Sequence, residues 1–241
     1  MNSATSRPSQ FRPLRGLLIS ALLLVAFAAL TVAAIGPLSS LDVALNGPRR
    51  LAPWRDELRA IDRIGQRAVC LPLLAVVAVV LAVRTRRLRP VTVAAVGVVS
   101  LNLTMLILKF SLGRGLPQLE DPAFFKGGDI YPSGHAGNVV LVYGLIVYLL
   151  IRYGSLRMRV RPWLVVAALS VVMVGTSLAL RWHWFTDLIG GLLVGAAVVL
   201  MTCTVDQMIP SGSASGPSGR RRAEVLDSPS AASDRAPAQR R

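Results

Sequence analysis

Charged side chains are scarce in this chain. Asp, Glu, Lys and Arg make up 16% of its 241 residues, whereas hydrophobic residues make up 53%. In soluble domains about a quarter of the residues are charged. The shortage of charge therefore disfavours a soluble domain and favours an integral membrane protein.

Lysine is almost absent. Lys109 and Lys126 are the only two, so the formal net charge of +15 comes almost entirely from arginine. A pI near 11.5 would also suit a nucleic-acid-binding protein, but that function needs a basic face on a folded soluble domain. Here the arginines cluster at the ends of apolar runs, as in membrane topology signals. We therefore expect a membrane bilayer and no nucleic acid as partner.

Cysteine is also rare. Cys70 and Cys203 lie in or beside apolar runs and show no metal-ligand spacing. This excludes a disulfide framework or a zinc site as an organising element. The first apolar run is too long for the hydrophobic region of a cleavable signal peptide, so we expect none.

Long apolar runs are abundant by contrast. A helix needs roughly 20 apolar residues to cross a bilayer, and six segments approach or reach that length: 16–38, 66–83, 90–110, 136–152, 162–180 and 185–205. The sequence therefore predicts an all-α integral membrane protein, a six-transmembrane-helix bundle.

Three parts of the chain differ in composition. Residues 1–15 form a short N-terminal segment, 16–209 the membrane domain, and 210–241 a basic tail rich in Ser, Gly, Pro and Ala. The tail has too few large apolar residues to offset its ordering entropy, so we predict that it is disordered.

The distribution of basic residues predicts the orientation. With the N terminus inside, 17 basic residues fall on the cytoplasmic side and 10 outside. The main exception is segment 39–65, where arginines are mixed with Asp42, Asp56, Glu57 and Asp62, as in an amphipathic helix on the membrane surface. We expect a multi-pass protein of the cell membrane with both termini cytoplasmic.

Histidine occurs only twice, in two polar islands between spans. His135 ends the string Tyr131-Pro132-Ser133-Gly134-His135, and His183 is followed four residues later by Asp187. Alternating spans place segments 39–65, 111–135 and 181–184 on one side, predicted to be the outer one. The i, i+4 spacing would put His183 and Asp187 on one face of a helix, where the carboxylate can orient the imidazole.

The neighbouring residues suit a phosphate group. A Ser-Gly turn ahead of a helix can offer backbone N–H groups to an anion, and Ser133 could add its hydroxyl. Lys109 and Arg114 would supply positive charge. A phosphate site beside a nucleophile and a proton donor indicates phosphoryl transfer through a phosphohistidine. Plainer roles stay open: Ser133 and Gly134 as turn and helix cap, and Lys109 as a snorkelling side chain.

These residues resemble a known family, the type 2 phosphatidic acid phosphatases, which are membrane lipid phosphatases with a six-helix core. The resemblance covers about 90–205 and rests on Lys109, the Pro-Ser-Gly-His string and the His-x-x-x-Asp element. It implies that His183 is the nucleophile, that Asp187 orients it and that His135 protonates the leaving group. Lys109, Ser133 and the Gly134 N–H would hold phosphoryl oxygens. It also implies that no metal or cofactor is needed.

Two motif positions depart from the family pattern. Where the family has Arg-Pro after the lysine, this chain has Leu116-Pro117, and Arg114 precedes that position by two residues. Where the family has Ser-Arg before the second histidine, this chain has Thr176-Ser177. Arg181 lies nearby and could supply the missing charge if the chain bends there. Arg114 and Arg181 are thus candidate phosphate ligands.

The resemblance implies a lipid phosphatase active at the extracytoplasmic face on a lipid or prenyl phosphate. The stretch from His183 to Gly191 is also similar to inositolphosphorylceramide synthases. A lipid phosphotransferase is therefore one alternative, and a non-catalytic lipid-phosphate binder or carrier is another. The sequence leaves the headgroup and the oligomeric state open.

Overall fold

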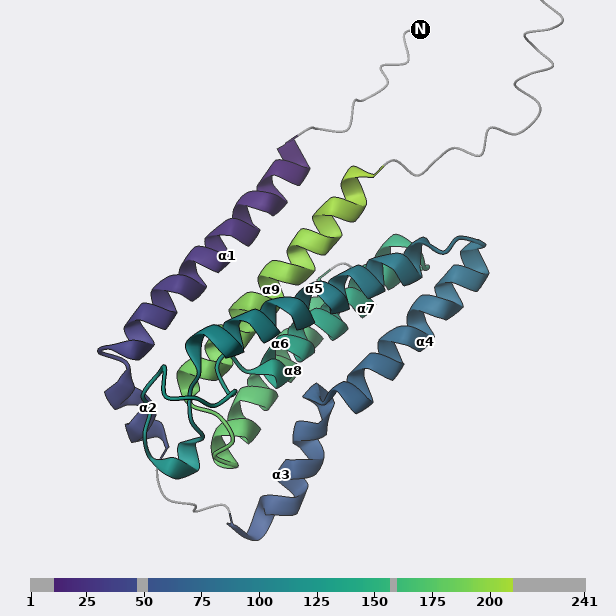
Figure 1. Cartoon of the computed structure of the whole chain (residues 1–241). Helices are drawn as coiled ribbons and strands as arrows, with labels where there is room; N and C mark the ends of the chain where they lie inside the picture. The colour runs from purple at the N-terminus through teal and green to yellow at the C-terminus, as the bar shows by residue number, and fades with distance from the viewer. Residues whose placement is uncertain (1–10, 47–51, 157–159, 210–241) are drawn as a thin grey trace, which may run out of the picture. The chain divides into compact units, whose positions relative to one another are not determined.

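The computed structural model describes residues 11–46, 52–156 and 160–209, whose regular structure is helical (Figure 1). Six helical segments are long and apolar enough to cross a membrane. They are α1 (Phe11–Ile35), α4 (Arg67–Thr85), α5 (Arg89–Leu112), the Gly134–Arg152 span, α8 (Arg161–Ala179) and α9 (Phe185–Met208). The predicted six-helix membrane fold is confirmed. The predicted disordered tail, 210–241, lies outside the described residues.

The boundaries differ from the predicted ones by a few residues, for local reasons. The first span was expected to reach residue 38, but α1 ends at Ile35. Gly36 and Pro37 follow, and proline cannot continue a helix because it lacks an N–H group. The Gly134–Arg152 span consists of α6 (Gly134–Asn138), a π-helical turn at Val139–Tyr143 and α7 (Gly144–Arg152).

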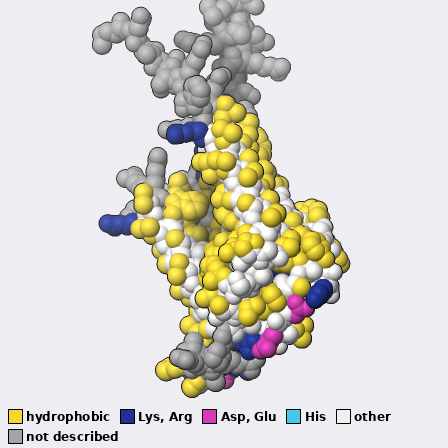
Figure 2. Space-filling view, turned by 90° about the vertical axis from the view of Figure 1, so that its left-hand side faces the viewer, with side chains coloured by type: hydrophobic (Ala, Val, Ile, Leu, Met, Phe, Trp, Pro, Cys, Tyr) yellow, Lys and Arg dark blue, Asp and Glu magenta, His cyan; other side chains and the backbone are white. Residues whose placement is uncertain are grey.

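Two of the six spans form the centre of the bundle. In the Gly134–Arg152 span and in α9, 61% of the apolar window is buried, compared with 22% in α1 and α8. The outer helices therefore turn most of their apolar side chains outward, and Figure 2 shows a broad hydrophobic surface. A surface of this kind suits lipid, where burial in protein is not needed to remove apolar groups from water.

Segment 39–65 does not form one amphipathic helix. It folds into α2 (Ser39–Leu45), a 3₁₀ turn at Ala52–Trp54, α3 (Arg55–Asp62) and a second 3₁₀ turn at Arg63–Gly65. The acidic residues of this segment differ in their exposure. Asp56 is exposed, whereas Asp42 and Asp62 are 1% and 0% exposed. The expected amphipathic helix on the membrane surface is therefore wrong for Asp42 and Asp62, because polar partners hold both carboxylates inside the bundle.

A polar cluster around Asp206 joins α5, α7 and α9. Asp206 of α9 accepts hydrogen bonds from Arg89 Nε of α5 at 2.7 Å and from the Tyr153 hydroxyl at 2.7 Å. The Tyr148 hydroxyl of α7 also donates to this carboxylate. Burial, together with the bond to Asp206, raises the pKa of Tyr153 to about 12, so its hydroxyl stays protonated and donates. The cluster fixes the end of the bundle that lies away from the histidines.

Close approach of α6 to α9 sets the position of the Ser-Gly-His turn. A Cβ atom on Gly191 would lie 2.3 Å from the Ser133 carbonyl oxygen, and one on Gly195 would lie 2.7 Å from the Gly137 carbonyl oxygen. Both distances are too short for any side chain. The two glycines of α9 therefore let the backbone of the turn rest directly on the central helix, as small residues do in membrane helix packing.

Gly191→Ala should destabilise the protein, because its Cβ would collide with backbone that cannot move aside as a side chain would. Overpacking of this kind costs about 1–3 kcal/mol, and we expect a lower melting temperature in detergent. Gly175→Ala is the matched control, since no atom lies within 4 Å of a Cβ at that helical position. Equal melting temperatures for the two variants would show that the α6–α9 contact is not tight.

Candidate active site

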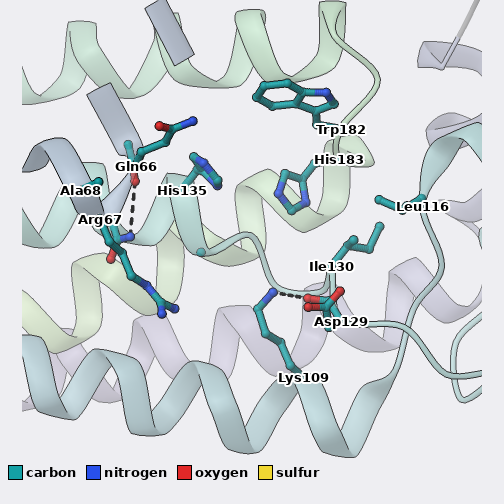
Figure 3. Close-up of a pocket in the computed structure, with 13 residues that line it drawn as sticks. Gln66, Arg67, Ala68, Lys109, Leu116, Asp129, Ile130, His135, Trp182 and His183 are labelled. Carbon is teal, nitrogen blue, oxygen red and sulfur yellow. Dashed lines mark hydrogen bonds between the residues drawn. The ribbon is translucent and has the colours of Figure 1, made fainter. Parts of the chain in front are cut away.

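Both histidines border a cavity of about 580 Å³ at one end of the bundle (Figure 3). The His135 and His183 ring centroids are 6.3 Å apart, and the rings are inclined by 59°. His183 is 9% exposed, whereas about a third of the His135 side chain is exposed. The two residues that are 48 positions apart in sequence thus face the same space, as the alternation of spans predicted.

His183 is backed by Asp187 as predicted, but the two do not share a helix. His183 precedes α9, and Asp187 lies in its first turn. The Trp184 N–H donates to Asp187 Oδ2 at 2.9 Å, which folds the chain back so that this oxygen lies 3.5 Å from His183 Nδ1. That separation is longer than a hydrogen bond, but catalytic hydrogen bonds often tighten only when substrate binds. Because the carboxylate faces Nδ1, Nε2 is the ring nitrogen that Asp187 leaves available for chemistry.

The structure places Arg114 outside the cavity, in the protein interior. Its guanidinium donates to Asp42 Oδ2 at 2.6 Å, to Asp187 Oδ1 at 2.6 Å and to Thr186 Oγ1 at 2.8 Å, and its Nε donates to the Pro122 carbonyl. The side chain is fully buried and lies 4.5 Å from the centre of the Phe124 ring. The predicted role as a phosphate ligand is therefore replaced by a structural one, because protein groups already occupy its donors.

Arg181, like Arg114, does not border the cavity. The chain does bend at this residue, as a phosphate-binding role would require, since its φ is +56° and it lies between α8 and α9. However, Arg181 Nε donates to Asn46 Oδ1 at 2.9 Å, and its terminal nitrogen donates to the Pro117 carbonyl at 3.2 Å. The guanidinium ties two loops together, and Arg181 does not border the cavity.

The two residues of the Ser-Gly turn have different roles in the structure, and only Gly134 borders the cavity. Ser133 is fully buried and caps α6, since its Oγ accepts from the Ala136 N–H at 3.4 Å. Its own N–H donates to the Asp187 carbonyl at 2.9 Å, so Ser133 supports the turn without bordering the cavity. Gly134 does border the cavity, and a Cβ there would meet no atom within 4 Å. The open space beside this first residue of α6 can admit an anion.

Lys109 and Arg67 supply the positive charge that borders the cavity. Lys109 lies near the end of α5, and its Nζ donates to the Asp129 carbonyl. Arg67 is the first residue of α4, and Figure 3 shows both side chains extending into the same cavity from different helices. Sequence reasoning missed Arg67 because it belongs to no recognised motif and opens an apolar span. Only its position in the fold brings it to the histidines.

Asp62 is a second residue of the site that sequence reasoning did not place beside a histidine. It is the last residue of α3 and is fully buried, with Oδ1 accepting from the Ser177 hydroxyl at 2.7 Å. Its Oδ2 lies 3.8 Å from His135 Nε2. Each histidine therefore has one buried carboxylate beside it.

The cavity offers no evident metal site within the described ranges. No group of three or more His, Cys, Asp or Glu side chains gathers there in a way that could hold a metal ion. Cationic side chains and backbone N–H groups are the anion-binding groups that this cavity offers.

Fold and site together define a six-span membrane protein with a histidine-lined, positively charged cavity. The family model of the PAP2 superfamily matches residues 63–209, and the chain belongs to this superfamily. The match includes Arg67 and extends upstream of the 90–205 region in which the resemblance was recognised.

A sequence comparison and a structure comparison agree with this assignment. The chain is 28% identical over 105 residues to phosphatidylglycerophosphatase B of Bacillus subtilis (strain 168), an alignment that covers 43% of this chain and about half, 51%, of that protein. The fold of the present chain is similar to that in the crystal structure of a transmembrane PAP2 type phosphatidylglycerolphosphate phosphatase from Bacillus subtilis. That comparison gives a TM-score of 0.67 at 20% identity and covers 80% of this chain and 98% of the other.

Arg67→Ala should weaken the binding of inorganic phosphate by about tenfold or more, because hydrogen bonds to charged groups contribute about 1.5–3 kcal/mol. Isothermal titration of the purified protein in detergent would measure this. Arg63→Ala is the matched control, since Arg63 is exposed four residues before Arg67 and does not border the cavity. Unchanged affinity in Arg67→Ala would show that this residue does not bind the anion.

Proposed function

We propose that the protein is a membrane lipid-phosphate phosphatase that hydrolyses a phosphomonoester or diphosphate on a lipid or prenyl carrier. The observation that carries the proposal is the pair of histidines facing one cavity, with His183 backed by Asp187 and two cations alongside. Membership of the PAP2 superfamily and the similarity to a phosphatidylglycerophosphatase support the same reaction class.

The first step is attack by His183 Nε2 on phosphorus. A P–N bond forms while the P–O bond to the leaving alcohol or phosphate breaks, and His135 gives its proton to the departing oxygen. Asp187 stabilises the positive charge that develops on the His183 ring, because its Oδ2 faces Nδ1. Lys109, Arg67 and the Gly134 N–H offset the charge on the phosphoryl oxygens.

The second step reverses the proton transfer. His135, now neutral, accepts a proton from water as the water oxygen attacks phosphorus. The P–N bond breaks, and His183 returns to its starting form with inorganic phosphate released. Nothing in these steps calls for a metal ion, so we expect metal-independent turnover. An alcohol in place of water would give a phosphotransferase by the same chemistry.

The orientation proposal follows from charge. With both termini in the cytoplasm, more basic residues lie inside than outside. The histidine cavity then opens at the extracytoplasmic face, where it would meet lipids of the outer leaflet.

Purified protein in detergent should release inorganic phosphate from phosphatidic acid or a polyprenyl phosphate, and chelator should leave the rate unchanged. His183→Ala should reduce the rate by several orders of magnitude, since it removes the nucleophile. Acid-labile, base-stable labelling of the wild type by a ³²P substrate would report the phosphohistidine. Release that survives in His183→Ala would refute the mechanism. Transfer to an added alcohol without release to water would identify a transferase.

The topology can be tested in intact cells. Single cysteines at Ser3 and Ser230, in a chain whose Cys70 and Cys203 are replaced by alanine, should resist a membrane-impermeant maleimide. A cysteine replacing the exposed Asp56 should react. The reverse pattern would place the cavity on the cytoplasmic side.

A further inference from the structure

The buried carboxylate of Asp62 has no part in the reaction scheme above. It is fully buried, and Oδ2 has no hydrogen-bond partner among the described residues. Leaving a carboxylate charge in the interior with an unsatisfied oxygen is costly, so such groups are normally paired or hydrogen-bonded. The group that Oδ2 faces therefore decides how this charge is balanced.

That side is occupied by His135. The distance from Asp62 Oδ2 to His135 Nε2 is 3.8 Å, the only ion-pair contact that Asp62 makes within the part of the chain described. Its other oxygen is held at 2.7 Å by the Ser177 hydroxyl of α8. A neutral hydroxyl orients the carboxylate without cancelling its charge. The charge of Asp62 is therefore available to His135.

Ser177 occupies the position where the resembling family has arginine. In this chain the residue at that position is a neutral serine, whose hydroxyl donates to Asp62 Oδ1. Serine brings no positive charge to Asp62, so the charge of the carboxylate is left for the imidazole.

We propose that Asp62 is the positioning residue of the acid–base histidine: it orients the His135 ring and stabilises its protonated form. This inference rests on the proposed function for its catalytic consequence. Before the first step the carboxylate faces an imidazolium, and after His135 has given its proton to the leaving oxygen it faces a neutral ring. Three further groups that face His135 are cationic or titratable: His183, Lys109 and Arg67. Burial is the main effect that opposes a positive charge on His135, these three groups add to it, and Asp62 counteracts them.

The catalytic test exploits the leaving group. Asp62→Asn should lower kcat/KM, which reports the first step alone, for phosphatidic acid by about 10- to 100-fold, a fraction of the range that general acid catalysis contributes, because its alkoxide leaving group needs a proton. The value of kcat/KM for 4-nitrophenyl phosphate, which releases an acidic phenol, should fall much less. Asp56→Asn, the same substitution on the exposed face of α3, should change neither rate. An equal loss on both substrates would assign Asp62 a merely structural role.

A second measurement does not depend on catalysis. Because the chain has two histidines, ¹⁵N-histidine labelling gives two sets of imidazole signals, and His183→Ala identifies the His135 set. In Asp62→Asn the His135 signals should titrate at lower pH than in the wild type, and in Asp56→Asn they should not move. Identical titration in the wild type and Asp62→Asn would overturn the proposal, whether or not the protein proves to be a phosphatase.

Asp62 is buried, so its variant could fail to fold. Ser177→Ala then serves as the second variant, because it keeps the charge and frees the carboxylate to turn. It should give the same selective loss on phosphatidic acid by a smaller factor. Wild-type rates on both substrates in Ser177→Ala would contradict the proposed orienting contact.

Discussion

One buried guanidinium holds the cavity end of the bundle together. Arg114 lies between Asp42 of α2 and Asp187 of α9, at 2.6 Å from each, and also binds the Thr186 hydroxyl. Removing one member of a buried charge cluster costs about 3–5 kcal/mol, because the others are left uncompensated. The position of Asp187, and through it that of His183, depends on this arrangement.

Charge balance explains how the same cluster can serve both structure and chemistry. Arg114 offsets one of the two carboxylates, so Asp42, Asp187 and Arg114 together carry one formal negative charge in the interior. His183 Nδ1 lies 3.5 Å from Asp187, where that charge favours a ring that becomes positive. Asp62 gives His135 a similar neighbour. The cations that border the cavity, Lys109 and Arg67, come from other helices.

The motif residues were easier to predict than the cationic ones, for a physical reason. The turn at 132–135 and the pair His183 and Asp187 are read locally, since a turn or a few residues of chain bring the groups together. A cation can reach a phosphate from any helix that ends nearby. Arg114 and Arg181 lie close to the motifs in sequence, yet their donors are taken up by Asp42, Asp187, Asn46 and loop carbonyls. Arg67 lies far from the motifs in sequence and borders the cavity.

The sequence by itself determined the six spans, because the length of an apolar run and its flanking prolines and glycines are local properties. It also determined that both histidines lie at one end of the bundle, since alternating spans leave no other arrangement. The tertiary structure decided which charges are buried and which remain open to a ligand. Asp42 and Asp62 sit in the same charged segment as the exposed Asp56. Their burial depends on Arg114, Thr186 and Ser177, partners more than 70 residues away that only the packed bundle brings within hydrogen-bond distance.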